Sequence, residues 1–471
     1  MNGHECTEIL FSQLERTNRL DSEFYKKNSL AIVKLLEDIS AKPLTNLIDV
    51  SDGNHMGISD KFTSEGIPYY RGQDIHNFFI DNANPICIDE DTFNISYMQR
   101  SHLKKGDVLL SIVGTIGEVA LVSKDDKATC NCKLAILRPH DIEKSALIAI
   151  YLRTKYGFDQ VDKFKRGAVQ MGYLLEDMNQ ILMPEFTDNL EKAITKAIEG
   201  VKLLTDRSNK QYSDAEDCLL SEIGIDMSAI ANGGVAIKSF SECFLVQNRI
   251  DSEFYQPKYD AIIDAILKYD ASAKTIDDVA TYVFTGECAE EYYNYDSGLC
   301  HYVRGTDIHD GMVDIDLEHS VIPEKHNKFV SEGDIITGRV GTIGNFGVIP
   351  KELDNSVCSD NVLCFHLPDN YNPNVYALYF NSSVIKELTN RMSRGSVQQR
   401  LNQETLRELL VPYIIEDIQK EINNKIMSSF ELKIKAECLL ECAKTAVEMA
   451  IEQSEAIAIS WLENKINVLT K

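Results

Sequence analysis

Asn18-Arg-Leu-Asp-Ser-Glu-Phe-Tyr25 recurs almost unchanged as Asn248-Arg-Ile-Asp-Ser-Glu-Phe-Tyr255. A repeat this far apart is a whole domain, because the repeat unit of a solenoid has only about 20–50 residues. The chain of 471 residues is therefore predicted to contain two similar domains, each long enough to bury its own core. Three more strings recur in the same order, at offsets between 227 and 233 residues: Arg71-Gly-Gln-Asp-Ile-His76 and Arg304-Gly-Thr-Asp-Ile-His309, Val113-Gly-Thr-Ile-Gly117 and Val340-Gly-Thr-Ile-Gly344, and Arg166-Gly-Ala-Val-Gln170 and Arg394-Gly-Ser-Val-Gln398.

Both halves have the sequence pattern of a mixed α+β fold. Short β-prone runs alternate with Gly, Asp and Asn, and a more helical stretch follows them. Each half is therefore predicted to be an α+β domain, with a short helix before it at 26–38 or 259–269. The runs and the helical stretch are 108–113, 133–137 and 145–156 in the first half, and 334–337, 361–365 and 374–380 in the second.

A helical period follows each domain, after Pro184 and again after Pro412. Apolar residues there recur at steps of three and four, which is the seam that a partner helix fills. Each segment would be about 50 Å long at 1.5 Å per residue, which is too long to lie on one small domain. We therefore expect two long helices that pair antiparallel with pseudo-two-fold symmetry, and two separate surface helices are the alternative. The seams are Leu190, Ile194, Ala197, Val201 and Leu204, and then Ile414, Ile418, Ile422, Ile426, Phe430 and Ile434, continuing through Cys438 and Val447 towards Trp461.

The formal net charge of −25 argues against a protein that binds nucleic acid by itself, because its long-range field repels phosphates. DNA binding by this chain would need basic residues gathered locally and help from a partner. The twelve cysteines form no CxxC pair, so we expect free thiols in a reducing cytoplasm and no metal site. No signal peptide and no apolar run of about 18 residues is present, so a membrane span is not expected.

The repeated Val-Gly-Thr-Ile-Gly string has two interpretations. A phosphate cradle would require Gly-Lys-Ser/Thr and a following helix, and a dinucleotide site would require GxGxxG, neither of which is found. A tight structural turn at a sheet edge, which uses the backbone freedom of glycine, is favoured. Arg339 precedes the second copy at the place where the first has Ile112, and it is a further candidate DNA contact.

The repeated Arg-Gly-x-Asp-Ile string leaves two interpretations open. Arg71 and Arg304 could contact guanine or phosphate, or each could pair with the nearby Asp and lock a turn. The residue between Gly and Asp differs, Gln73 against Thr306, and a position that changes inside a fixed frame is where different base pairs could be read.

The Arg-Gly-Ala/Ser-Val-Gln strings lie in locally basic surroundings. Arginine binds phosphate and glutamine reads adenine, so these loops are candidate DNA contacts, with a solvated loop as the alternative. The candidates are Lys165, Arg166 and Gln170 in the first half and Arg394, Gln398 and Gln399 in the second. No methyltransferase, Walker, HExxH or GxSxG motif is found, so no catalytic residue is predicted.

These features together resemble the specificity (S) subunit of Type I restriction–modification enzymes, over nearly the whole chain. Ser51-Asp-Gly-Asn-His55 followed by Gly66-Ile-Pro-Tyr-Tyr70 is similar to the opening of a target recognition domain of that family, as is Thr285-Gly286 followed by Gly298-Leu-Cys-His-Tyr302. Gly106-Asp-Val-Leu-Leu-Ser111 with Gly114-Thr-Ile-Gly117 is similar to its shared strand–turn element. The chain departs from the family in its acidity and in the Asn-Arg-x-Asp-Ser-Glu-Phe-Tyr lead-in, which looks more like specificity regions of related methyltransferase systems.

The resemblance implies a division of the chain. Residues 1–185 and 248–412 would be the first and second target-recognition domains, joined by a linker at 224–247. Residues 186–223 would be the first long spacer helix, and 413–471 the second long spacer helix and C-terminal tail.

The resemblance also implies a mechanism and partners. Each domain would read half of a bipartite site in double-stranded DNA, and the helices would span more than one DNA turn of roughly 34 Å. Two methyltransferase (M) subunits would bind the helices, carry S-adenosylmethionine and flip the target adenine, and restriction (R) subunits would join for cleavage. The chain itself would hold no cofactor.

Other functions stay open from the sequence. A specificity subunit of a related phage-defence methyltransferase system is close to the first hypothesis. A second hypothesis is an acidic DNA mimic or interaction protein without DNA affinity, for which the negative net charge is itself the functional feature. An enzyme that acts alone is the third.

Overall fold

The computed structural model describes residues 6–9, 19–80, 85–167, 171–225, 235–245, 250–296, 298–315, 317–340, 343–392 and 400–471. The chain divides into two compact units. Unit 1 contains Met1–Asp206 and Leu432–Lys471, and unit 2 contains Arg207–Glu431.

The core of unit 1 is an antiparallel sheet of four strands in the order β2-β9-β6-β7. Alternate residues of its central strands point to opposite faces, so that Leu110 faces one hydrophobic cluster and Leu109 the other. Because both faces are covered, the central strands read as nearly continuous apolar runs. Helix α3 lines the first cluster, and the second sheet, β3-β5-β4-β8, contributes to the other. The bounds are β2 (Ile48–Asp52), β9 (Leu134–Pro139), β6 (Val108–Ser111), β7 (Val119–Leu121), β3 (Phe62–Thr63), β5 (Ile86–Ile88), β4 (Ile67–Tyr70), β8 (Thr129–Cys130), α3 (Ser145–Arg153) and α4 (Lys155–Lys163).

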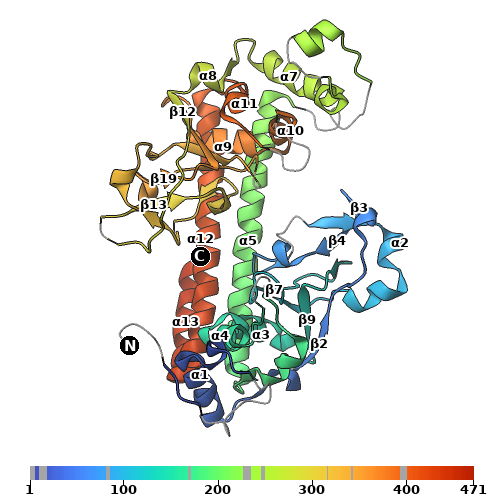
Figure 1. The fold of residues 1–471 in the computed structure, drawn as a ribbon, viewed down its shortest axis with the longest axis vertical. Helices are drawn as coiled ribbons and strands as arrows, with labels where there is room; N and C mark the ends of the chain where they lie inside the picture. The colour runs from blue at the N-terminus through green and yellow to red at the C-terminus, as the bar shows by residue number, and fades with distance from the viewer. Residues whose placement is uncertain are drawn as a thin grey trace. The chain divides into compact units, whose positions relative to one another are not determined.

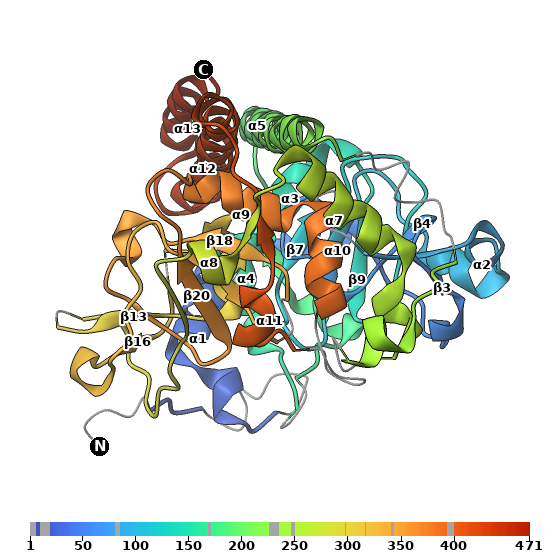
Figure 2. The same cartoon turned by 90° about the horizontal axis from the view of Figure 1, so that it is seen from above.

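Unit 2 repeats the central sheet of this topology, but its second sheet has three strands where that of unit 1 has four. Its central sheet has the order β12-β20-β17-β18, and a smaller sheet has the order β16-β13-β19. Strand β13 runs parallel to β19, as β4 runs parallel to β8 in unit 1. The predicted α+β domain, present twice, is confirmed (Figure 1). The bounds are β12 (Tyr282–Thr285), β20 (Val362–His366), β17 (Ile335–Gly338), β18 (Phe346–Val348), β16 (Ser320–Val321), β13 (Cys300–Val303), β19 (Val357–Cys358), α9 (Pro373–Asn381), which lies beside β18 in Figure 2, and α10 (Ser383–Met392).

Shorter elements surround the sheets. The two short helices expected before the domains are confirmed as α1 (Lys27–Asp38) and α7 (Pro257–Tyr269). Antiparallel pairs β1-β10 and β11-β21 close each domain at the point where the long helices begin. The remaining bounds are β1 (Lys42–Pro43), β10 (Leu182–Met183), β11 (Lys274–Thr275), β21 (Leu410–Val411), α2 (Glu90–Phe93), α8 (Ile276–Val279), α11 (Gln403–Arg407), β14 (Ile308–His309) and β15 (Met312–Val313).

Two long helices, α5 (Asp188–Ile223) and α12 (Glu416–Glu452), lie side by side (Figure 1). Within unit 2, Ser208 contacts Ser429 and Cys218 contacts Glu421, so the residue numbers rise along one helix as they fall along the other. This is the predicted antiparallel pairing, and it is confirmed. The predicted seam residues Leu190, Ile194, Ala197, Val201 and Leu204 are all buried in the core of unit 1.

The C-terminal seam is not one continuous helix as the sequence suggested. Helix α12 ends at Glu452, and α13 (Glu455–Leu469) begins directly after Ser454. Ser454 caps α13, because its side chain accepts a hydrogen bond from Ile457 N. Glu455 accepts from Thr187 N just before α5, and a Cβ added at Gly200 would lie 3.1 Å from Thr470 Cγ2. Helix α13 therefore runs back along α5 as the third helix of this bundle. Among the described residues, no helix is long and apolar enough to span a membrane.

Candidate nucleic-acid interface

The repeated strings converge on one end of each central sheet. In unit 1, β4 ends at Tyr70 and leads into Arg71, while β6 ends at Ser111 and leads into the Val-Gly-Thr-Ile-Gly turn. A Cβ added at Gly72 would lie 3.8 Å from Val113 O, so these two loops are neighbours. The fold thus brings motifs that are far apart in sequence to one place.

The segment that follows Arg166 joins the same cluster. Gly172 forms antiparallel bridges with both Val113 and Arg166. In unit 2 the corresponding bridge pairs Val340 with Arg400. Val113 is therefore held against Gly172, which also pairs with Arg166, in unit 1, and Val340 is held against Arg400 in unit 2.

The Val-Gly-Thr-Ile-Gly string is a structural turn, as expected. It joins β6 to β7, the edge strand of the sheet, and Gly117 has φ of 101°. A Cβ at Gly117 would lie 2.8 Å from Phe158 Cε2 of α4. Glycine is required there for both its backbone conformation and its lack of a side chain. Gly344, the matching residue in unit 2, has φ of 79° and a close neighbour in Lys386.

Arg71 and Arg304 each pair with the aspartate three residues later. Arg71 Nε lies 2.9 Å from Asp74 Oδ2, and that same carboxylate oxygen accepts from Arg71 N at 2.8 Å. Asp307 accepts from Arg304 N at 2.7 Å and from its guanidinium at 3.2 Å. The turn lock left open from the sequence is therefore present in both domains. Both arginine side chains keep about a third of their surface exposed, 31% and 36%. Arg304 Nε is buried and has no hydrogen-bond partner among the described residues.

Gln73 and Thr306, the positions that differ inside this frame, are both exposed. The Thr306 hydroxyl donates to Asp307 Oδ1 at 3.1 Å. The two domains thus present different side chains on the same rigid turn.

Arg166 and Lys165 are also paired with carboxylates. Arg166 donates to both oxygens of Asp177, at 2.8 and 2.6 Å, and Lys165 pairs with Asp162. Burial raises the pKa of Asp177, against the lowering effect of the Arg166 charge. Arg166 Nε is buried and has no hydrogen-bond partner among the described residues. The remaining candidates of these loops, Gln170, Arg394, Gln398 and Gln399, lie outside the described residues.

Arg339 is fixed by backbone carbonyls. Its guanidinium donates to Asp360 O at 2.9 Å and to Leu401 O at 3.4 Å. No ion pair of Arg339 with a carboxylate occurs in the described part of the chain. Its positive charge is therefore less compensated than those of Arg71, Arg166 and Arg304.

The Asn-Arg-x-Asp-Ser-Glu-Phe-Tyr lead-in supports these loops, a role that the sequence analysis missed. Arg19 donates to Lys165 O at 2.9 Å and to Lys163 O at 3.4 Å, and its hydrogen bond holds the pKa of Asp21 below the usual value. Lys163 Nζ lies 4.4 Å from the centre of the Phe24 ring.

Unit 2 builds the same support with a different cation. Arg391, at the position that matches Lys163, lies 4.1 Å from the ring of Phe254 and donates to its carbonyl at 2.7 Å. The signal in the sequence was the lead-in itself, which recurs together with the loops that it holds.

The arrangement suits recognition better than chemistry. Its charged groups are engaged in fixing loops, and no set of three His, Cys, Asp or Glu residues in the described ranges is placed to hold a metal ion. Rigid loops with exposed tips at one end of a sheet are the usual way in which a scaffold presents a binding surface.

Comparison with known proteins finds a family model and solved structures to which the chain is similar. Residues 270–440 match the model of a family described as the Type I restriction modification DNA specificity domain. No curated protein matches the chain in sequence. Two solved structures are similar over most of their length. The S subunit of a Type I restriction-modification system from M. genitalium is 13% identical, covers 90% of this chain and 95% of its own, and has a TM-score of 0.33. The HsdS subunit from Thermoanaerobacter tengcongensis is 12% identical, covers 87% and 93%, and has a TM-score of 0.26.

Proposed function

We propose that the chain is a specificity subunit of a Type I restriction–modification system and that its two domains each read one half of a bipartite DNA target. Subunits of this family are the non-catalytic part of the complex. The observation that carries the proposal is the repeated central sheet, with the Arg–Asp lock and the glycine turn at the same place in each copy. A second copy of a DNA specificity domain needs a second stretch of DNA to read.

We take residues 1–185 and 248–412 as the two target-recognition domains, with the linker at 224–247. The segments 186–223 and 413–471 act as the spacer, the latter with α13 folded back as its tail. Equal topology supports equal roles for the domains, and the paired apolar faces of α5 and α12 support a stiff spacer.

The candidate residues divide by chemistry. Arg71 and Arg304 would contact guanine or phosphate through the exposed part of their side chains, while Gln73 and Thr306 offer different groups to the neighbouring bases. Lys165, Arg166 and Arg339 would contact the DNA backbone. Gln170, Arg394, Gln398 and Gln399 keep the roles proposed from the sequence.

The partners of a Type I specificity subunit are DNA and the methyltransferase and restriction subunits. We propose that two methyltransferase subunits bind this chain, one for each half-site, and that they carry the S-adenosylmethionine. Their basic surface would offset a chain of net charge −25. All twelve cysteines are free thiols, which supports assembly in the reducing cytoplasm.

The test is to co-purify the chain with its methyltransferase and to map methylated adenines in the host genome. A split recognition sequence is expected, together with binding that weakens steeply with salt. Arg71→Ala should relax one half of that sequence and Arg304→Ala the other, so each variant is the control for the other. Thermal unfolding of both variants checks that the lost Arg–Asp lock has not unfolded the domain.

A contrary result has a clear meaning. Absence of DNA affinity with every partner present would favour the acidic mimic instead. A methylation pattern that neither substitution alters would remove both arginines from the recognition surface.

A further inference from the structure

One segment differs between the two domains although it starts and ends at matching points. It comprises residues 54–66 in unit 1 and 287–299 in unit 2, which are equal in length. At its start, Asn54 N donates to Cys130 O and Glu287 N donates to Cys358 O, both at 2.8 Å.

The glycine before each segment is equally enclosed. A Cβ at Gly53 or at Gly286 would lie within 2.4 Å of two backbone carbonyl oxygens. At the far end, Tyr70 O accepts from Asn131 N at 2.9 Å and Val303 O accepts from Ser359 N at 2.8 Å. Arg71 and Arg304 follow directly. The backbone contacts on both sides of the segment are thus the same in both units, and only the sequence of the segment differs.

The amino-acid composition of segment 287–299 is unusual. It contains three tyrosines and four carboxylates and no lysine or arginine, whereas 54–66 has no tyrosine. The tyrosines are Tyr292, Tyr293 and Tyr295, and the carboxylates are Glu287, Glu290, Glu291 and Asp296.

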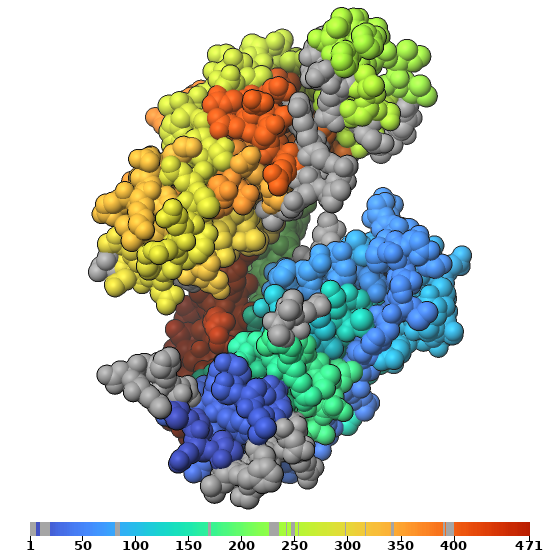
Figure 3. Space-filling model, viewed as in Figure 1, coloured from blue at the N-terminus to red at the C-terminus, as the bar shows by residue number. Residues whose placement is uncertain are grey.

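Two of these tyrosines present their rings to solvent. Tyr295 is 60% exposed and Tyr292 is 51% exposed. The segment that carries them belongs to the part of the chain drawn in yellow in Figure 3. Tyr295 stacks parallel on His301, with ring centres 4.3 Å apart. Burial lowers the pKa of His301, which favours the neutral ring. Such supported rings are ordered before any ligand arrives, which lowers the entropic penalty of binding.

The aromatic surface is continuous with the Arg-Gly-x-Asp-Ile turn. The Tyr292 ring lies 4.9 Å from that of His319, and His319 Nε2 lies 3.4 Å from a terminal nitrogen of Arg304. The described contacts of Arg71, in the other domain, include no aromatic ring. Unit 2 therefore links Arg304 to the segment through His319, whereas in unit 1 the exposed aromatic of the segment, Phe62, packs on Tyr69 with ring centres 5.5 Å apart.

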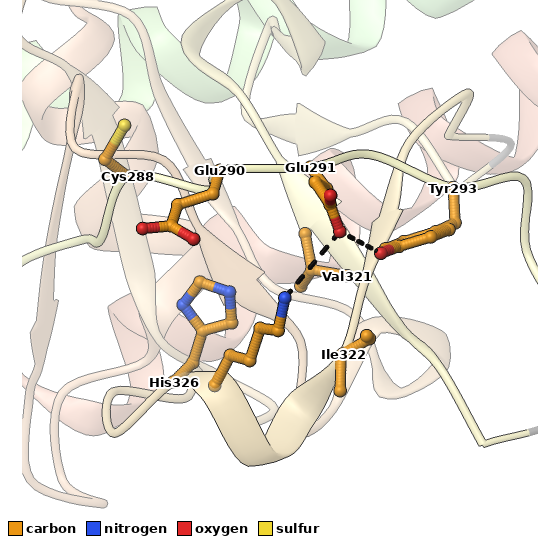
Figure 4. A pocket seen from close by; sticks show the side chains of 8 residues that line it. Cys288, Glu290, Glu291, Tyr293, Val321, Ile322 and His326 are labelled. Carbon is orange, nitrogen blue, oxygen red and sulfur yellow. Dashed lines mark hydrogen bonds and ion pairs between the residues drawn. The ribbon is translucent and has the colours of Figure 1, made fainter.

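The segment is held by contacts of Glu291 and Tyr293. Both residues line a pocket of about 410 Å³, and Figure 4 shows their side chains pointing toward each other. Tyr293 donates its hydroxyl to Glu291, which lies 3.7 Å from Lys325 Nζ, and Tyr293 exchanges two backbone hydrogen bonds of 2.9 Å with Ser320. Tyr293 is thus a fixed residue between Tyr292 and Tyr295 in the sequence.

We propose that segment 287–299 determines the specificity of the second domain, with Tyr292 and Tyr295 contacting base edges in its half-site. The proposal rests on the proposed function and adds the residues that do the reading. A tyrosine ring packs on the thymine methyl group, and its hydroxyl bonds base acceptors or donors. Because the segment carries four carboxylates and no cation, it has no positive charge that would attract phosphates.

The test uses the full complex and the double variant Tyr292→Ala/Tyr295→Ala. Discrimination between the cognate second half-site and single-base changes in it should fall about tenfold, which is the effect of one base contact. Recognition of the first half-site should stay unchanged, and so should the slope of binding against salt concentration, which counts phosphate contacts. Phe62→Ala, a 38% exposed aromatic in segment 54–66, is the matched control and should leave the second half-site intact.

The outcomes separate the two proposals. A wild-type complex without a bipartite target overturns both. The inference alone is overturned if the target is bipartite and both variants still read its second half as well as the wild type does. The two variants are the double variant and Tyr295→Phe, each checked by thermal unfolding. Weaker binding to every sequence with a smaller salt slope also overturns it, because that result assigns the segment to the phosphates.

Discussion

Ser208 and Ser429 hydrogen-bond each other reciprocally across the pair of long helices. The hydroxyl of Ser208 donates to Ser429 O at 2.8 Å, the hydroxyl of Ser429 donates to Ser208 O at 2.9 Å, and the two hydroxyl oxygens are 3.0 Å apart. Both residues are buried. A polar pair that is satisfied on both sides fixes the register of two helices whose other contacts are apolar and unspecific in direction.

Replacing both of these serines should destabilise unit 2 by less than the sum of the two single replacements. Ser208→Ala or Ser429→Ala leaves a buried hydroxyl with fewer partners and should lower the free energy of unfolding by about 1 kcal/mol. The double variant should lose less than the sum, since neither hydroxyl is then orphaned. Urea unfolding measures all three. Ser221→Ala, on the exposed face of α5, is the control and should change stability by less than about 0.5 kcal/mol. Strict additivity would show that the pair is not coupled.

The sequence predicted the helix pair but not this contact. The apolar steps from Leu190 to Leu204 indicate a seam, and a serine at the next position simply interrupts that pattern. The break between α12 and α13, after Gln453, was missed for a similar reason. Apolar residues continue to Trp461, and a single Ser454 gives a weak capping signal. Local periodicity predicts which face is buried, but it does not say where a helix turns back.

The same limit applies to the candidate site. The spacing of Arg71 and Asp74 allowed a turn lock to be foreseen as one of two interpretations, because residues three apart are in reach of each other. The contact of Arg19 with Lys165 spans 146 residues, and no local rule predicts it. Repetition of the lead-in was the one clue that it mattered, and only the fold shows what it supports.

Arg19 is expected to position the loop at Arg166 without touching DNA itself. Its side chain is only 11% exposed, and its planar, forked guanidinium group donates hydrogen bonds to two carbonyls of that loop. Arg19→Ala should raise hydrogen exchange at residues 163–167 and weaken recognition of the first half-site about tenfold, leaving the second intact. Arg19→Lys keeps the charge but loses the fork, so it should behave nearly like alanine. Full recovery by lysine would show that charge alone matters.

The free cysteines should divide sharply in reactivity. Cys6, Cys288 and Cys438 are exposed, whereas Cys130, Cys358 and Cys364 are buried and their pKa values are raised by burial. Since the thiolate is the reactive form, Ellman's reagent at pH 8 should modify the exposed three quickly and the buried three only after unfolding. Mass spectrometry of the labelled peptides assigns each site. Rapid labelling of Cys130 in the folded protein would contradict its enclosure in the sheet.

Tyr269 should titrate abnormally because of burial and of Glu222. Its hydroxyl lies 3.1 Å from Glu222 Oε1, and burial first, then this carboxylate, raise the pKa of Tyr269 from 10 to about 12. The folded chain therefore keeps this proton when the unfolded chain has lost it. The resulting stabilisation is complete below pH 10 and is lost as the pH rises from 10 to about 12.

Glu222→Gln should bring the pKa of Tyr269 part of the way back towards 10, since burial persists while the negative charge is gone. Carbon-13 NMR of labelled tyrosine rings follows the titration, and Tyr269→Phe identifies the resonance. Tyr413, which is 39% exposed, serves as an internal reference in the same spectra. An unchanged Tyr269 titration in the glutamine variant would mean that the end of α5 does not hold α7 through this contact.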